Sequence, residues 1–250
     1  NSTLALVAAV FHMMNHATFK ASLFMAAGIV DHETGTRDLG RLGGLRHLMP
    51  LTTALAIVAA GAMAGVPLLN GFLSKEMFFE ESIVAGSESG LRFTLPAVAT
   101  LAGVFSVAYS VRLVHRVFFG PVSQDLPHVP REPTRGMLLP SAVLVIACVL
   151  VGMLPAQPIG PLLDTAARSI LGPGVPQYEL AVWHGFTPAL VMSMIALAGG
   201  TTLYVLLHWQ SRTMRPTPLP SRLNAGRIFD LVNVALIRGA ARLTRAAFSW

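Results

Sequence analysis

The stretch Val66-Pro-Leu-Leu-Asn-Gly-Phe-Leu-Ser-Lys-Glu76 interrupts a long apolar run and then places a lysine and a glutamate side by side. Proline removes a backbone N–H, and glycine permits close approach of chains or an unusual φ angle. The sequence therefore predicts a discontinuous helix, broken at Pro67, Asn70 and Gly71. Such a break is tolerated in a membrane only where the backbone is buried in protein or lines a cavity, and the broken helices of transporters hold ion sites there.

The lysine of this stretch, Lys75, is one of only two in the chain, the other being Lys20, whereas there are sixteen arginines. Both lysines lie in apolar runs that contain no arginine. A desolvated lysine can release its proton, but an arginine keeps its charge. The two lysines are therefore candidate proton carriers, with Glu76 beside the second one. The alternative for Lys75 and Glu76 is the solvated outer end of a helix.

The composition indicates an all-α, polytopic membrane protein. Of the 250 residues, 53% are hydrophobic and only 12% are charged, whereas soluble domains have about 25% charged residues. The net charge of +6 resembles that of a nucleic-acid-binding protein, but the arginines lie between and after the apolar runs. We therefore interpret them as loop charges of a membrane protein and expect the lipid bilayer, not nucleic acid, as a partner.

The apolar runs predict a transmembrane domain over residues 1–208 with about five helices, one of them discontinuous. The expected spans are residues 3–30, 51–85 with a break at 66–71, 93–119, 137–154 and 185–208. A proline-rich linker is expected over 209–221. Residues 222–250 mix five arginines with apolar side chains, which predicts an amphipathic helix lying in the membrane interface. A solvated helix packed on a partner is the alternative for this segment.

The arginines at successive ends of the expected spans alternate in number along the chain. The loops and the tail contain three, one, four, one and seven of them, where the count of four includes Arg112 and Arg116 in the last turns of the span 93–119. Because arginine-rich loops stay on the cytoplasmic side, residue 1 is expected outside and the C-terminal tail in the cytoplasm of a plasma-membrane protein. The sequence starts without a methionine and ends within a helical pattern, so we expect it to be part of a longer protein.

Three ionisable residues, His12, His16 and Lys20, are spaced by four within the first expected span. This spacing puts them on one helix face, with about 6 Å of rise between neighbours. An ionisable group at this depth is costly unless it faces protein or water, and histidine can both donate and accept a proton. We interpret the three residues as a proton wire leading toward Lys75. The alternative is that each histidine is an ordinary buried residue with a hydrogen-bonding partner.

The sequence offers no pattern for bond-making chemistry. It has no phosphate-binding glycine loop, no nucleophile triad and no ligand spacing typical of haem, iron–sulfur clusters or zinc. The single cysteine, Cys148, lies in an apolar run and has no partner for an internal disulfide. We therefore expect no cofactor, no metal site and no enzymatic activity.

Three stretches resemble a known superfamily. Residues 11–28 read FHMMNHATFKASLFMAAG, residues 64–79 read AGVPLLNGFLSKEMFF and residues 180–186 read LAVWHGF; shorter matches are Thr36-Arg-Asp38 and Leu42-Gly-Gly-Leu45. Together they resemble the proton-translocating antiporter-like subunits, which occur in respiratory complex I, membrane hydrogenases and multisubunit (Mrp-type) Na+/H+ antiporters. The second and third stretches are most similar to the A subunit of the antiporters. Asn15 stands where the family often has threonine, which exchanges one polar group for another.

The resemblance implies two inverted repeats of five helices, each with one broken helix, of which this chain looks like the C-terminal part. It also implies that Lys20 and the two histidines lie on a central hydrophilic axis and that Lys75 is the terminal lysine near an outward exit. The first broken helix of the family, with its lysine and partner glutamate, is not in this chain.

The leading hypothesis is therefore a subunit of a hetero-oligomeric Na+/H+ antiporter that carries protons along these histidines and lysines. One alternative is a proton-pumping subunit of NADH:quinone oxidoreductase or of a membrane-bound hydrogenase. A second alternative is a scaffold subunit that transports nothing and whose C-terminal helix clamps its neighbours.

Overall fold

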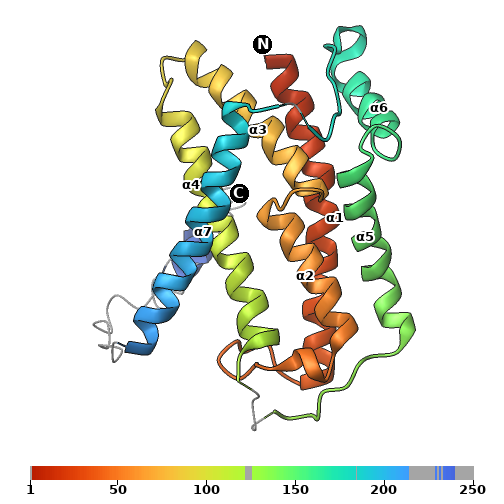
Figure 1. Cartoon of the computed structure of the whole chain (residues 1–250), viewed down its shortest axis with the longest axis vertical. Helices are drawn as coiled ribbons and strands as arrows, with labels where there is room; N and C mark the ends of the chain where they lie inside the picture. The colour runs from red at the N-terminus through yellow and green to blue at the C-terminus, as the bar shows by residue number, and fades with distance from the viewer. Residues whose placement is uncertain are drawn as a thin grey trace, which may run out of the picture. The chain divides into compact units, whose positions relative to one another are not determined.

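The computed structural model describes residues 2–121, 126–183, 185–213, 229, 231 and 233–239. Over these residues the regular secondary structure is helical, and none of them lies in a strand (Figure 1). The chain divides into two compact units, residues 1–206 and 207–250, which are described separately.

The helices of the first unit follow one another along the chain and are joined by connections of different lengths. They are α1 (Ser2–Thr34), α2 (Pro50–Ala64), α3 (Asn70–Glu88), α4 (Thr94–Val114), α5 (Arg135–Met153), α6 (Gly160–Leu171) and α7 (Pro188–Thr213), the last of which continues into the second unit. A π-helical turn, His115–Phe119, extends α4, and 3₁₀ turns lie at Leu45–His47 and Gly172–Gly174. The first helix is longer than the expected span 3–30, since residues 31–34 are also helical.

Three helical segments of the described chain are long and apolar enough to cross a membrane: Thr94–Phe119, Arg135–Met153 and Pro188–Ser211. The sequence predicted about five spans. The difference arises because α2 has only 15 residues, and because α1 and α3 carry the polar and ionisable side chains of the proposed wire. A length and hydropathy criterion therefore passes over the helices that hold the candidate functional groups.

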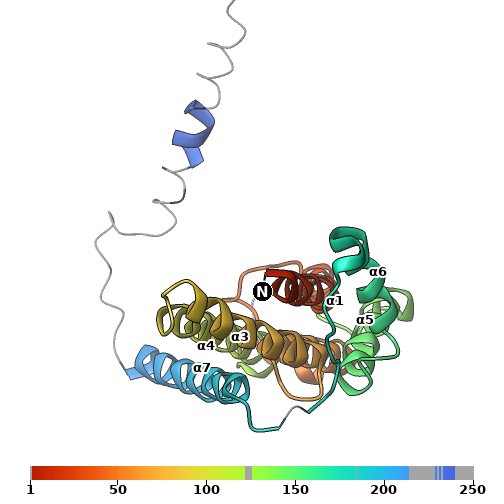
Figure 2. The ribbon, with the colours of Figure 1, turned by 90° about the horizontal axis from the view of Figure 1, so that it is seen from above.

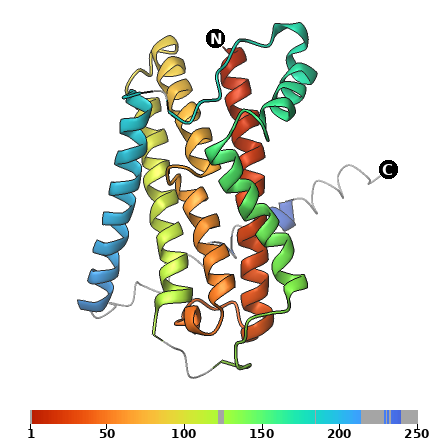
Figure 3. The ribbon, with the colours of Figure 1, turned by 45° about the vertical axis from the view of Figure 1, so that its right-hand side comes forward.

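Helix α1 packs against α2, α3, α5 and α6. Helices α2 and α3 are stacked nearly end to end beside it, with the break between them at mid-height (Figures 1 and 3). Helix α4 packs against both half-helices, and α7 lies on the far side of α4 from α1 (Figure 2). The two half-helices are thus enclosed by α1, α4 and α5.

The break itself depends on close backbone contacts. Helix α2 ends at Gly65, whose φ of 87° is left-handed, and Leu68 adopts a φ of 68°, which is unusual for a residue with a Cβ. A Cβ on Gly71 would lie 1.8 Å from the carbonyl oxygen of Ala62, and one on Gly152 of α5 would lie 2.2 Å from the carbonyl oxygen of Leu68. Glycine at these two positions lets α3 and α5 approach the break.

The other end of α2 is held by a carboxylate from a distant loop. Glu132 accepts hydrogen bonds from the backbone N–H groups of Leu51, at 2.7 Å, and Thr52, at 3.0 Å, and from the Thr52 hydroxyl, at 2.6 Å. The first N–H groups of a helix lack intrahelical partners, and the positive end of its dipole favours a negative charge. Glu132 therefore caps α2 from outside the helix.

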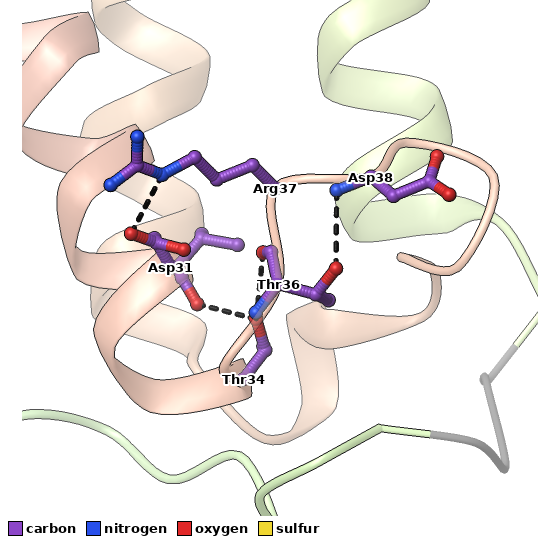
Figure 4. A network of polar contacts seen from close by, with 6 residues as sticks. Asp31, Thr34, Thr36, Arg37 and Asp38 are labelled. Carbon is purple, nitrogen blue, oxygen red and sulfur yellow. Dashed lines mark hydrogen bonds and ion pairs between the residues drawn. The ribbon is translucent and has the colours of Figure 1, made fainter.

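The connection from α1 to α2 is a polar turn (Figure 4). Arg37 Nε donates to Asp31 Oδ2 at 2.8 Å, and the Thr34 hydroxyl receives the N–H of Thr36 at 3.4 Å. The Thr36 hydroxyl in turn receives the N–H of Asp38 at 3.2 Å. The Thr-Arg-Asp motif of the sequence thus shapes this turn. The turn and residues 126–134 lie at the end of the helices opposite to the start of α1 and to α6 (Figure 1).

Little of the second unit falls within the described residues. Phe229, Leu231 and residues 233–239 are helical and largely exposed. Residues 209–213, which were expected in the linker, belong to α7 instead. The remainder of the expected linker, 214–221, and most of the expected interfacial helix, 222–250, lie outside the described residues.

Replacing Gly71 with alanine is expected to destabilise the break, because the new Cβ would overlap the carbonyl oxygen of Ala62. Overpacking of this kind costs about 1–3 kcal/mol. Gly28→Ala in α1 is the matched control, since nothing lies within 4 Å of its Cβ position, and alanine in a helix interior is favoured by about 0.8–1 kcal/mol. Thermal unfolding in detergent measures both variants. Equal unfolding midpoints would contradict the close contact at Gly71.

Candidate functional site

The ammonium group of Lys75 lies inside the helix break. Its Nζ donates to the carbonyl oxygens of Met63, at 2.6 Å, and Ala64, at 3.1 Å, and to Ser106 Oγ of α4 at 3.3 Å. Carbonyls in the last turn of a helix have no intrahelical partner and carry the negative end of its dipole. Lys75, in the first turns of α3, therefore caps the C-terminus of α2. Two backbone carbonyl oxygens at the end of α2 bind its charge.

The histidines of α1 reach toward α3 one residue before this lysine. His12 Nδ1 lies 3.1 Å from Ser74 Oγ, a hydrogen bond whose direction depends on the histidine tautomer. The ring centroids of His12 and His16 are 5.9 Å apart. The ring centroids of His16 and Phe19 are 5.2 Å apart, and these two rings pack in a T-shaped arrangement. His16 is exposed. The two histidines are neighbours, but they stand farther apart than a direct hydrogen bond requires.

Lys20 contacts α4 instead of α3. Its Nζ donates to the hydroxyl of Tyr109 at 2.7 Å and lies 5.2 Å from the centroid of the tyrosine ring. The same hydroxyl donates to Met63 Sδ. Since Met63 also supplies the carbonyl oxygen nearest to Lys75, Tyr109 and Met63 together link the two lysines.

Glu76 does not join this cluster, although it follows Lys75 in the sequence. It is 6% exposed, and its Oε1 accepts a hydrogen bond from Thr187 Oγ1 at 3.4 Å. It lines a cavity of about 250 Å³ beside the first half of α3, together with three further glutamates: Glu80, Glu81 and Glu179. Lys75 and Glu76 therefore point to different sides of α3.

The residues predicted to break the helix have distinct surroundings. Pro67 is exposed in the turn, whereas Asn70 is fully buried and begins α3. Asn70 Nδ2 donates to the carbonyl oxygen of Asn15 at 3.5 Å, and its Oδ1 has no hydrogen-bonding partner in the described part of the chain. Gly71 lies against the end of α2, as described above. The break therefore also fastens α3 to α1.

Three hydroxyl-bearing residues of the site were not predicted from the sequence: Ser74, Ser106 and Tyr109. The last two stand three residues apart in α4, a helix that is otherwise strongly apolar. Residues at this spacing share a helix face. A polar face on an apolar span was therefore the sequence signal that could have indicated these two site residues. Serine and tyrosine are common in such spans, which is why the spacing alone did not single them out.

Beyond the apolar helices, two groups of the α6 region have shifted pKa values. Burial and the carboxylate of Asp164 raise the pKa of Tyr178. A hydrogen bond to Asp164 raises the pKa of Arg168, with Nε 2.8 Å from the carboxylate. Tyr178 therefore lines the acidic cavity as a neutral phenol. Within the residues that the structure describes, no three His, Cys, Asp or Glu side chains are arranged to hold a metal ion.

Residues 1–101 match the family described as "NADH:quinone oxidoreductase/Mrp antiporter, TM". The A/B subunit of a probable K(+)/H(+) antiporter from Rhizobium meliloti is 58% identical over 94% of this chain and 24% of its own length. The A subunit of a Na(+)/H(+) antiporter from Bacillus subtilis is 36% identical over 97% of this chain and 32% of its own length.

Solved structures give the same picture. A chain of the Mrp complex from Dietzia sp. DQ12-45-1b aligns with a TM-score of 0.73 and 33% identity over 98% of this chain and 26% of its own. A chain of an archaeal membrane-bound sulfane sulfur reductase aligns with a TM-score of 0.61 and 26% identity over 90% of this chain and 36% of its own. The chain therefore spans between 24% and 36% of the length of these relatives.

Ser106→Ala is expected to weaken the binding of the Lys75 ammonium, because one of its three acceptors is lost. Hydrogen bonds to charged groups contribute about 1.5–3 kcal/mol, so the midpoint of thermal unfolding in detergent should fall. Ser110→Ala is the matched control in the same helix. Its hydroxyl donates only to the carbonyl oxygen of Ser106 one turn earlier, a bond of little net value in a helix. An unchanged midpoint for Ser106→Ala would contradict the three-acceptor arrangement.

Proposed function

Because residues 1–101 match the NADH:quinone oxidoreductase/Mrp antiporter family of transmembrane domains, we propose that the chain is a proton-translocating part of the A subunit of a multisubunit monovalent cation/H+ antiporter. Relatives that align over most of the chain are named as A or A/B subunits of Na(+)/H(+) and K(+)/H(+) antiporters. The transported cation is Na+ or K+, and the partners are the other subunits of the antiporter complex. The chain is a transporter component, not an enzyme.

The observation that carries this proposal is the ammonium of Lys75 within the helix break. In its protonated form, Lys75 is attracted to the carbonyl oxygens and to the negative end of the α2 dipole. Once deprotonated, it loses this attraction and has an unshared electron pair to accept a new proton. An uncharged lysine is tolerated at this depth far better than an unpaired charge. The site therefore has two states that differ by one proton, which proton translocation requires.

The neighbouring groups supply and remove that proton. His12, His16 and Lys20 form the hydrophilic line on α1, and His12 reaches Ser74 beside the break. On another side of α3, Glu76 lines the acidic cavity. We assign the α1 residues to the proton path inside the membrane and Lys75 to its outward end, with Glu76 at the boundary to the outer surface.

The orientation follows from the distribution of arginines. The turn after α1 contains Arg37, Arg41 and Arg46, and Arg131 lies in the loop at the same end of the helices. By the positive-inside rule this end faces the cytoplasm. We therefore place residue 1 outside and the tail after α7 in the cytoplasm of a multi-pass plasma-membrane protein, with residues 1–208 in the membrane and 222–250 along its surface.

Lys75→Ala in the full-length antiporter is expected to abolish cation/H+ exchange while the complex still assembles. Lys75→Arg is expected to fail as well, since a guanidinium keeps its charge and releases no proton. Dye-based proton flux in everted membrane vesicles measures the exchange, and immunoblotting of the purified complex measures assembly.

Arg92→Ala is the control, because it removes a positive charge from the exposed outer loop. Exchange at the wild-type rate in Lys75→Ala would exclude the proposed role. Survival of Lys75→Arg alone would show that only the charge is needed, as in a scaffold or an electrostatic gate. Co-purification of quinone-reducing or hydrogenase subunits would instead favour a redox-driven pump.

A further inference from the structure

Tyr109 stands between the two lysines of the chain. Its hydroxyl accepts a hydrogen bond from Lys20 Nζ at 2.7 Å and donates one to Met63 Sδ. The backbone oxygen of Met63 accepts from Lys75 Nζ at 2.6 Å and from Ser106 Oγ at 3.2 Å. Side chains from α3 and α4 thus meet at Met63 of α2, and Lys20 of α1 is linked to this residue through Tyr109.

The contacts on the α1 line are weaker than these. His12 and His16 are separated by 5.9 Å between ring centroids, and within the described residues no hydrogen bond joins His16 to Lys20. By contrast, Lys20 has a short, charge-assisted hydrogen bond to Tyr109, and Lys75 has one of its three acceptors, Ser106, on the same helix as Tyr109. The contacts between the lysines therefore run over α4 and Met63, and within the described residues the one step without a direct hydrogen bond lies between Tyr109 and Ser106, three residues apart on α4.

We propose that Tyr109 is a proton-relay residue between Lys20 and Lys75, and that the hydroxyls of Tyr109 and Ser106 on α4 form the route. The inference rests on the proposed proton-translocating function. It adds two residues of α4, whereas the histidines and lysines of the proposed wire lie on α1 and α3. Tyr109 acts by holding the Lys20 ammonium against α4, where its proton has an oxygen to move to.

The transfer balances without any oxidant or cofactor. The hydroxyls of Tyr109 and Ser106, which donate to Met63 in the structure, first turn along the route. The Lys20 ammonium then gives one proton to the Tyr109 oxygen, while the hydroxyl proton of Tyr109 moves to Ser106 through a water molecule that this step requires. The Ser106 hydroxyl passes its own proton to the neutral amine of Lys75, whose ammonium form it accepts a hydrogen bond from. Lys20 ends neutral, Lys75 ends as an ammonium, and both hydroxyls regain a proton. Rotation of the hydroxyls restores the starting arrangement.

Tyr109→Phe in the full-length antiporter complex separates the hydroxyl from the ring. Phenylalanine keeps the aromatic face that lies 5.2 Å from the Lys20 ammonium but removes the acceptor oxygen. In everted vesicles we expect kcat for exchange to fall roughly tenfold or more, as for loss of a proton-transfer group, with KM for Na+ or K+ unchanged. A merely structural role would reduce the amount of assembled complex and leave turnover per complex intact.

Tyr204→Phe is the matched control, because its hydroxyl contacts His115 away from the lysines, at 2.7 Å from Nδ1; it should keep wild-type kcat. Ser106→Ala should also lower kcat. If the two hydroxyls share one route, the double variant is no slower than the slower single variant. Multiplied losses in the double variant would overturn the shared route.

Wild-type kcat in Tyr109→Phe would overturn the proposal. If Tyr109→Phe does not assemble, wild-type kcat per assembled complex in Ser106→Ala overturns it equally. The Lys75→Ala variant distinguishes failure of the proposed function from failure of the α4 route. Exchange that survives in Lys75→Ala refutes the proposed function, whereas loss in Lys75→Ala together with silent α4 variants refutes only the α4 route.

Discussion

The interaction on which the rest of the site depends is the bond between the Lys75 ammonium and the last carbonyls of α2. A helix that ends inside a bundle leaves backbone oxygens without partners, and a buried lysine needs acceptors for its protons. Here the Lys75 ammonium and these carbonyl oxygens satisfy one another, through N···O distances of 2.6 and 3.1 Å. The glycines at 71 and 152 and the left-handed backbone at Gly65 and Leu68 are the steric conditions for bringing these groups together.

A helix that carries such groups looks less like a membrane span than its neighbours do. Of the helices that supply side chains to the site, α4 is among the three segments of the described chain that meet a criterion of length and hydropathy, whereas α1 and α3 do not meet it and the apolar α2 is too short. The polar side chains of α1 are compensated by specific partners: His12 by Ser74, Lys20 by Tyr109 and Asn15 by the carbonyl oxygen of Phe11. Polarity in these helices is therefore a property of paired groups.

Local signals predicted much of the fold. Proline and glycine near the break, and charged turns between apolar runs, indicated where helices begin and end. The helical structure extends beyond the expected ends by four residues in α1 and by five in α7, because mostly polar residues that lie outside the apolar runs continue these two helices. The partners within the site could not be predicted because they come from distant parts of the chain. The contact of Lys20 with Tyr109 joins residues 89 positions apart, and Lys75 and Glu76 diverge because successive residues of a helix point about 100° apart.

Both ends of helix α2 are capped by charged side chains from outside the helix. The Glu132 carboxylate binds its first N–H groups, and the Lys75 ammonium binds its last carbonyls. With 15 residues, it is about 22 Å long at 1.5 Å per residue. One continuous helix therefore joins the loop at Glu132 to the carbonyl oxygens that hold Lys75, and no connecting side chain is needed between the two.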